Sequence, residues 1–82
     1  MTPEEIRTVL ADEFGRIAPE ISLDEVDADG DLRDEFDIDS MDFLNLVIAL
    51  HQRLGVDIPE SDYAQLVSLR ALSGYLTARL AG

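Results

Sequence analysis

The sequence predicts an all-α protein: a small four-helix bundle of three main helices and one short helix, with a long loop between the first two. Apolar residues recur at spacings of three and four in three segments, which is the periodicity of helices packed on a core. Residues that favour helix starts stand directly before these segments. At 82 residues the chain is long enough for one domain, expected over residues 1–82, and too short for two.

The first helix is expected over residues 3–17. Thr2 can cap it, Pro3 suits the first helical position, and Glu5 stands where a capping box requires an acid. Pro19 ends the segment, because proline cannot continue a helix. The residues expected on its buried face are Ile6, Val9, Leu10, Phe14 and Ile17.

Residues 20–39 are strongly acidic, and Arg33 is their only base. Apolar residues are nevertheless scattered among the acids, whereas a disordered segment would hold few of them. These residues are Ile21, Leu23, Val26, Leu32, Phe36 and Ile38. The segment is therefore predicted to be an ordered loop held down by apolar side chains, and loops of this length in compact domains tend to be functional.

The second helix is expected from Ser40 to Leu54, with Gly55 as its C-terminal stop. A short helix is expected over Glu60–Gln65. Ser68 is expected to cap the last helix, which runs to Leu80. Its predicted apolar stripe consists of Leu69, Leu72, Leu76 and Leu80, with Tyr75 alongside.

The second helix has two apolar faces when its residues are placed at steps of about 100°. The sector expected to face the core holds Phe43, Leu46, Val47, Leu50 and Leu54. A second ridge is formed by Met41, Leu44 and Ile48 and is bordered by the polar Asn45, His51 and Gln52. Either the helix is buried on both faces, or the ridge is an exposed docking surface for a partner protein. The second alternative is favoured, because so few helices can cover both faces.

Composition excludes several classes of function. The net charge is −12 and there is no lysine; such a surface repels nucleic acid and attracts basic protein surfaces, although charge can also serve solubility alone. The absence of cysteine rules out disulfides and thiolate chemistry. The sequence contains neither an apolar run of membrane-spanning length nor a secretory signal pattern, so a cytoplasmic location is expected.

The residues that could carry chemistry centre on Ser40. A serine nucleophile needs a base, and His51 lies about 16 Å further along the same helix, so the chain is not expected to be an enzyme. Either Asp39 or Ser40 could cap the helix. If Asp39 is the cap, the Ser40 hydroxyl is free at the positive end of a helix dipole, which tolerates phosphate well.

The acidic segment Glu25–Leu32 imitates a calcium-binding EF-hand loop, with Gly30 at the sixth position. The twelfth position, which requires a bidentate glutamate, is Phe36. No dedicated metal site is therefore predicted, while weak association of divalent cations stays open.

Asp39-Ser40-Met41 resembles the Asp-Ser-Leu signature of acyl carrier proteins, with methionine in the leucine position. The likeness covers about residues 4–80. The further matches in order and spacing are Asp42, Leu44–Leu50, Val56–Glu60 and Ser68–Leu69. This resemblance implies a freestanding, monomeric carrier. Its Ser40 would bear 4′-phosphopantetheine through a phosphodiester, and acyl groups would be carried on the arm as thioesters.

The same resemblance implies the partners. A phosphopantetheinyl transferase would install the arm from coenzyme A. An acyl-loading ligase and acyl-transfer or synthase enzymes would dock through basic patches on Met41, Asp42, Leu44 and Ile48, in a fatty-acid, polyketide or specialised aminoacyl pathway. An inner cavity would be lined by Phe43, Leu46 and Val47.

Two departures from the family pattern stand out. Asn45, His51 and Gln52 replace acids common in fatty-acid carriers, and Asp37 replaces a glycine; aspartate tolerates the left-handed conformation better than most residues. The alternative to a carrier is an unmodified acidic helical interaction module with weak divalent-cation binding.

Overall fold

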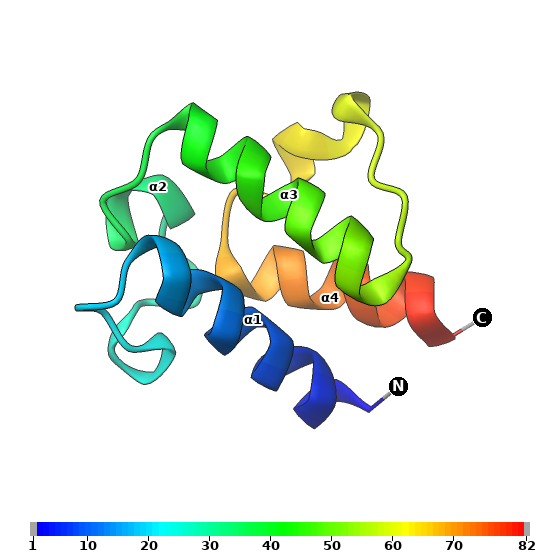
Figure 1. Cartoon of the computed structure of the whole chain (residues 1–82), viewed down its shortest axis with the longest axis horizontal. Coiled ribbons are helices and arrows are strands. Elements are labelled where there is room, and N and C mark those ends of the chain that lie inside the picture. The colour runs from blue at the N-terminus through cyan, green and yellow to red at the C-terminus, as the bar shows by residue number, and fades with distance from the viewer. Residues whose placement is uncertain (1, 82) are drawn as a thin grey trace.

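The computed structural model describes residues 2–81, and the protein in it is all-helical, as predicted (Figure 1). The elements in chain order are α1 (Pro3–Ile17), η1 (Leu23–Glu25), α2 (Leu32–Glu35), α3 (Ser40–Leu54), η2 (Glu60–Gln65) and α4 (Leu69–Ala81), where η marks a 3₁₀ helix. No helix of residues 2–81 is long and apolar enough to cross a membrane. The three long helices and the short η2 are those that the sequence predicted.

The long helices form the core of the bundle. Helix α1 packs against both α3 and α4, and it begins at the end of the bundle where the other two finish (Figure 1). The predicted signals at helix ends are confirmed. Thr2 and Glu5 form the capping box of α1, Gly55 ends α3 in the left-handed conformation with φ 69°, and the Ser68 hydroxyl accepts a hydrogen bond from the Ala71 amide at 3.1 Å.

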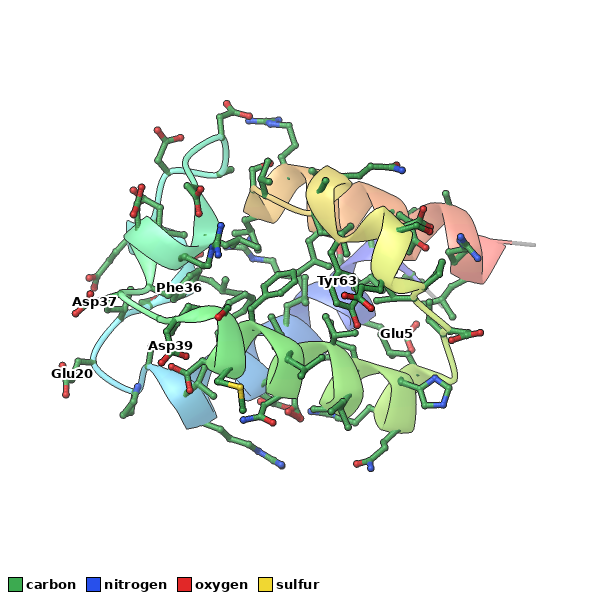
Figure 2. All side chains as sticks on the ribbon, turned by 90° about the horizontal axis from the view of Figure 1, so that it is seen from above. Glu5, Glu20, Phe36, Asp37, Asp39 and Tyr63 are labelled. Atoms are coloured by element: carbon green, nitrogen blue, oxygen red, sulfur yellow. The ribbon has the colours of Figure 1, made fainter. Side chains whose placement is uncertain are left out.

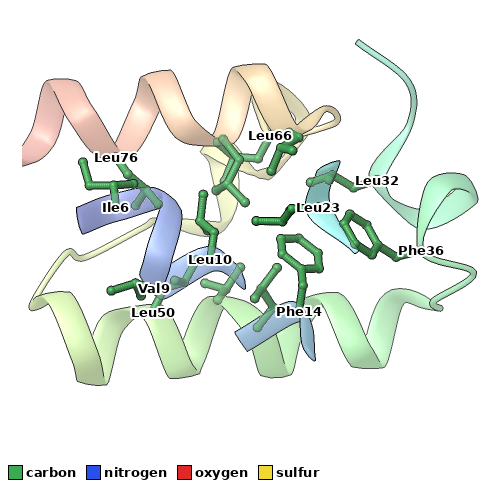
Figure 3. Close-up of a cluster of buried hydrophobic side chains, with 14 of the residues drawn as sticks. Ile6, Val9, Leu10, Phe14, Leu23, Leu32, Phe36, Leu50, Leu66 and Leu76 are labelled. Atoms are coloured by element: carbon green, nitrogen blue, oxygen red, sulfur yellow. The ribbon is translucent and has the colours of Figure 1, made fainter. Parts of the chain in front are cut away.

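Between α1 and α3 the predicted loop is ordered by its apolar residues. Leu23, Leu32, Phe36 and Ile38 are buried, while Ile21 and Val26 are half-buried. Figure 3 shows Phe36 facing Phe14 of α1; the two rings are stacked with centroids 4.1 Å apart. Helix η1 and the four-residue helix α2 were not predicted from the sequence, because a single turn is too short to show helical periodicity.

The acidic loop is fastened to the start of α4. The Leu32 amide donates to the Val67 carbonyl at 2.7 Å, and the Arg70 amide donates to the Ala28 carbonyl at 2.9 Å. The Arg70 guanidinium also donates to both carboxylate oxygens of Asp29, at 2.6 and 3.3 Å. These contacts hold α2 beside the segment that leads into α4.

The segment that imitates an EF-hand loop uses its carboxylates for internal hydrogen bonds. The Asp27 carboxylate accepts from the Asp29 amide at 3.0 Å, and the Glu35 carboxylate accepts from the Asp27 amide at 2.6 Å. Asp31 caps α2 by accepting from the Arg33 amide at 2.9 Å. Within the described part of the chain, no group of three or more His, Cys, Asp or Glu residues is arranged to hold a metal ion. The acids of this segment thus have structural roles.

We expect Asp29→Asn to lower stability at neutral pH but not in acid. Hydrogen bonds from Arg70, and then its charge, lower the pKa of Asp29 below the ordinary value of 3.8. A carboxyl whose pKa is lowered by folding stabilises the fold above its unfolded-state pKa, and this contribution is lost as the pH falls through the lowered value. Urea denaturation at a series of pH values should show the two proteins converging below about pH 4.

The matched control for this titration is Asp34→Asn, which removes an exposed acid of the same loop and corrects for the general relief of charge repulsion. A difference between wild type and Asp29→Asn that stayed constant from neutral pH into acid would contradict the ion-pair explanation.

Candidate functional site

The first turn of α3 settles which residue is the helix cap. The Asp39 carboxylate accepts from the Asp42 amide at 2.9 Å, and the Asp39 amide donates to the Asp42 carboxylate at 3.4 Å. This reciprocal pair is a capping box. Ser40 is therefore the first helical residue and not the cap. Its side chain is exposed, and its hydroxyl has no hydrogen-bond partner in the part of the chain that the structure describes.

The turn that leads into α3 is fixed from the protein interior. Phe36 and Ile38 are buried on either side of the exposed Asp37, and Figure 2 shows Phe36 lying inward of Asp37. Asp37 has a φ of 52°, so it adopts the left-handed conformation that the sequence analysis expected it to tolerate. The Ile38 amide donates to the Arg33 carbonyl at 3.0 Å. This turn gives Ser40 a defined place at the surface.

A pocket of about 500 Å³ opens beside Ser40, within the size range of small-molecule sites. Three segments supply its walls: α2, the first turns of α3, and η2 with the residues after it. Its lining residues are Asp31, Leu32, Arg33, Ser40, Met41, Phe43, Leu44, Glu60, Tyr63, Ala64, Leu66 and Val67. Of the three residues expected to line a cavity, Phe43 does so, whereas Leu46 and Val47 are buried in the core cluster and do not line this pocket.

An aromatic pair joins the two sides of the pocket. The rings of Phe43 on α3 and Tyr63 on η2 meet edge to face, with centroids 5.8 Å apart and an angle of 79° between their planes. In Figure 2 Tyr63 lies on the side of η2 that faces α3. Helix η2 is itself held on α4, because Asp62 accepts from the Tyr75 hydroxyl at 2.6 Å and from Arg79 at 3.2 Å. The pocket therefore has walls that are fixed to the rest of the bundle.

Arg33, Tyr63 and Val67 line the pocket and were not predicted to do so from the sequence. For Arg33 there was a signal, since it is the only base in the acidic segment. The other two depend on how η2 folds back onto α3, and no local pattern reveals this.

The second apolar ridge of α3 is exposed. The exposed fractions are 63% for Met41, 38% for Leu44 and 47% for Ile48, and Val67 across the pocket is 51% exposed. In the opposite sector Leu46, Val47 and Leu50 are buried, while Phe43 and Leu54 are half-buried. Burial of the helix on both faces is thus ruled out, and a continuous apolar surface begins one residue after Ser40.

The chain offers no catalytic pair for Ser40 within residues 2–80. His51 lies at the far end of α3, where its Nδ1 is 3.1 Å from the Val56 carbonyl oxygen. The neighbouring carboxylates of Asp39 and Asp42 are both engaged in the capping box. Ser40 therefore lacks a free base beside it, which a serine nucleophile requires.

These features define a small helical domain with a free hydroxyl at a helix start, beside a pocket and an exposed apolar ridge. In a comparison with known families, the family model described as the phosphopantetheine attachment site matches residues 4–76. The chain belongs to this family, that of the acyl carrier proteins. Its members are carriers and not catalysts, and their cofactor is 4′-phosphopantetheine.

Curated relatives span most of the chain. An acyl carrier protein of Campylobacter hominis is 32% identical over 73 residues, covering 89% of this chain and 86% of the relative. One of Lactobacillus johnsonii is 32% identical over 76 residues, covering 93% and 94%. One of Streptomyces coelicolor is 26% identical over 78 residues, covering 95% and 80%.

Proposed function

We propose that Ser40 is the residue to which 4′-phosphopantetheine is attached. The observation that carries the proposal is the free, exposed Ser40 hydroxyl at the first position of α3, with Asp39 serving as the cap. The positive end of a helix dipole favours a phosphate there. The residues fit the arm, because the pocket beside Ser40 offers about 500 Å³ and Met41 is one of its lining residues.

In this proposal the chain contributes position and not proton transfer. The Ser40 oxygen would attack the phosphorus that bears the pantetheine in coenzyme A. The diphosphate P–O bond would break, and adenosine 3′,5′-bisphosphate would leave. The Ser40 proton would pass to a base of the transferase, because Asp39 and Asp42 are held in the capping box. The arm supplies a thiol, which this cysteine-free chain lacks, and acyl groups would be carried on it as thioesters.

The proposed partners are the transferase, an acyl-loading ligase and the acyl-transfer or synthase enzymes of a fatty-acid, polyketide or specialised aminoacyl pathway. They would dock on the exposed ridge of Met41, Leu44 and Ile48 together with Asp42. Two observations support this docking proposal: the apolar side chains of the ridge are exposed, and the net charge of −12 favours encounter with basic surfaces. The cytoplasmic location and monomeric state expected from the sequence stay predictions.

The test of the attachment proposal is the intact mass of the protein after incubation with a phosphopantetheinyl transferase and coenzyme A. We expect one phosphopantetheinyl increment, located by peptide mapping on the peptide that contains Ser40, and none when coenzyme A is omitted. Absence of the increment with several different transferases would overturn the proposal and favour the unmodified acidic interaction module.

We expect Met41→Glu and Ile48→Glu each to reduce kcat/KM for the transferase by about tenfold, which corresponds to about 1.4 kcal/mol. A carboxylate in an apolar contact must lose its hydration when the partner docks, and this cost exceeds the benefit of an added negative charge. The measurement is the rate of holo-protein formation at limiting concentrations of each variant.

The matched control for the ridge is Ala11→Glu, which adds the same charge at an exposed position of α1 and should leave the rate unchanged. Circular dichroism should show wild-type helicity for all three variants. Marked unfolding of Met41→Glu or Ile48→Glu would mean that the ridge supports the core and would remove it as a docking surface.

A further inference from the structure

Arg33 differs from every other arginine in the chain. Five of the six arginines form an ion pair with a carboxylate. These pairs are Arg7 with Asp24, Arg16 with Glu13, Arg53 with Asp12 and Glu13, Arg70 with Asp29, and Arg79 with Asp62. Within residues 2–80, Arg33 alone forms none, although it lies in the most acidic segment, and it lines the same pocket as Ser40.

The backbone of Arg33 is fixed on both sides. Its amide donates to the Asp31 carboxylate at 2.9 Å, and its carbonyl accepts from the Ile38 amide at 3.0 Å. The preceding Leu32 is buried, and its amide donates to the Val67 carbonyl at 2.7 Å. The exposed side chain of Arg33 therefore extends from a fixed stretch of backbone and lines the pocket.

The carboxylates beside Ser40 would repel a negatively charged group attached to it. A negatively charged group on the Ser40 oxygen would lie close to the carboxylates of Asp39 and Asp42, which flank it in the first turn of α3. The helix dipole favours a negative charge there, but the Asp42 amide, one of the donors at this helix start, already donates to the Asp39 carboxylate. A second positive charge at the same pocket would offset more of this repulsion.

Two acids line the pocket, and neither is paired with the guanidinium of Arg33. Asp31 accepts its hydrogen bond from the backbone amide of Arg33, and Glu60 belongs to η2 on another wall of the pocket. A guanidinium presents its donors in a planar fork that matches the oxygens of phosphate and carboxylate groups. The side chain is thus suited to an anionic oxygen group from outside the chain.

We propose that Arg33 binds an anionic oxygen group of the unit attached at Ser40: either the phosphodiester that joins the arm to the serine, or a carboxylate at the far end of a carried acyl group. This inference rests on the proposed attachment at Ser40. Arg33 is then a positioning residue that draws the arm or its acyl group into the pocket and away from the carboxylates of Asp39 and Asp42.

The test compares holo protein of the wild type with Arg33→Gln, which removes the charge, and Arg33→Lys, which keeps the charge without the fork. Arg7→Gln is the matched control, because Arg7 is an exposed arginine of α1 outside this pocket. Each protein is first converted fully to the holo form with excess transferase, and the mass increment is checked. If wild type gains no increment, the proposed function fails; with the increment present, the remaining measurements test Arg33 alone.

The first measurement is the ³¹P resonance of the phosphodiester. If Arg33 binds it, the resonance moves in Arg33→Gln, moves less in Arg33→Lys and stays in place in Arg7→Gln. The second measurement uses two thioesters of equal chain length, one ending in a ¹³C-labelled carboxylate and one in a labelled methyl group. If Arg33 binds the carboxylate, the pKa of that group is lower in wild type than in Arg33→Gln, and the methyl signal is the same in both proteins.

A change in the ³¹P resonance assigns Arg33 to the phosphodiester, and a change in the carboxylate pKa with an unchanged ³¹P resonance assigns it to the carried acyl group. If neither responds to Arg33→Gln, or if Arg7→Gln changes them equally, the proposal is overturned.

Discussion

Ser40→Ala is expected to abolish attachment of the phosphopantetheinyl group completely, so that the intact mass stays unchanged with any transferase and coenzyme A. The physical reason is the loss of the free hydroxyl at the first position of α3, which lines the pocket. Acyl loading by any ligase should disappear with it, because the chain has no cysteine to offer another thiol.

The same variant should fold like the wild type. Asp39, and not Ser40, supplies the helix cap, and alanine is the residue most favourable to a helix interior. The Ser40 side chain is exposed, so the free energy of unfolding should change by no more than about 0.5 kcal/mol. Urea denaturation followed by circular dichroism measures this directly and separates a lost attachment site from a lost fold.

Ser61→Ala is the matched control for the loss of a hydroxyl. Ser61 is an exposed serine at the surface of η2 and lies outside the lining of the pocket. This variant should gain the full mass increment at the wild-type rate. An increment that persisted in Ser40→Ala would place the arm on another residue and would contradict the assignment of Ser40.

The long helices were predictable because their signals are local. The capping box of Thr2 and Glu5, the apolar stripe of α4 and the stop at Gly55 all lie within a few residues of the elements they define. The exposed ridge of α3 was also predictable, since helical geometry alone separates Met41 and Ile48 from the core-facing sector.

The parts that were missed depend on contacts between distant segments. Helix α2 is a single turn, and it is held by the hydrogen bond between Leu32 and Val67 and by the burial of Leu32. The ion pair of Asp29 with Arg70 joins residues 41 positions apart. No local pattern encodes such pairs, because each partner alone is an ordinary charged or apolar residue.

The candidate site was likewise predictable only where its signals are local. The cap at Asp39 could be predicted from neighbouring residues, and the resemblance of Asp39-Ser40-Met41 to a known signature is what marks Ser40 as the expected attachment point. The pocket was not predictable, because it exists only where α2, α3 and η2 meet. Arg33 and Tyr63 therefore line the pocket only because these three elements pack together.

Phe36→Ala is expected to lower the free energy of unfolding by about 3–5 kcal/mol, the usual cost of truncating a buried phenylalanine. The side chain is 1% exposed, and its stacking on Phe14 at 4.1 Å (Figure 3) adds about 0.5–1.5 kcal/mol to what burial alone provides. Small domains are stable by only about 5–15 kcal/mol, so the loss removes a large share of the stability. Urea denaturation of the wild type and of Phe36→Ala measures this difference in the free energy of unfolding.

Phe36→Leu is the informative companion, because it keeps an apolar side chain beneath the turn at Asp37 and leaves a smaller cavity. We expect it to be less destabilised than Phe36→Ala and to gain the phosphopantetheinyl increment at close to the wild-type rate while folded. If Phe36 fixes the turn that presents Ser40, Phe36→Ala should lose rate even at temperatures where it is still folded. If Phe36→Ala lowered the free energy of unfolding by less than about 1 kcal/mol, far short of the usual cost, the acidic loop would be held chiefly by Leu32 and the Asp29–Arg70 ion pair.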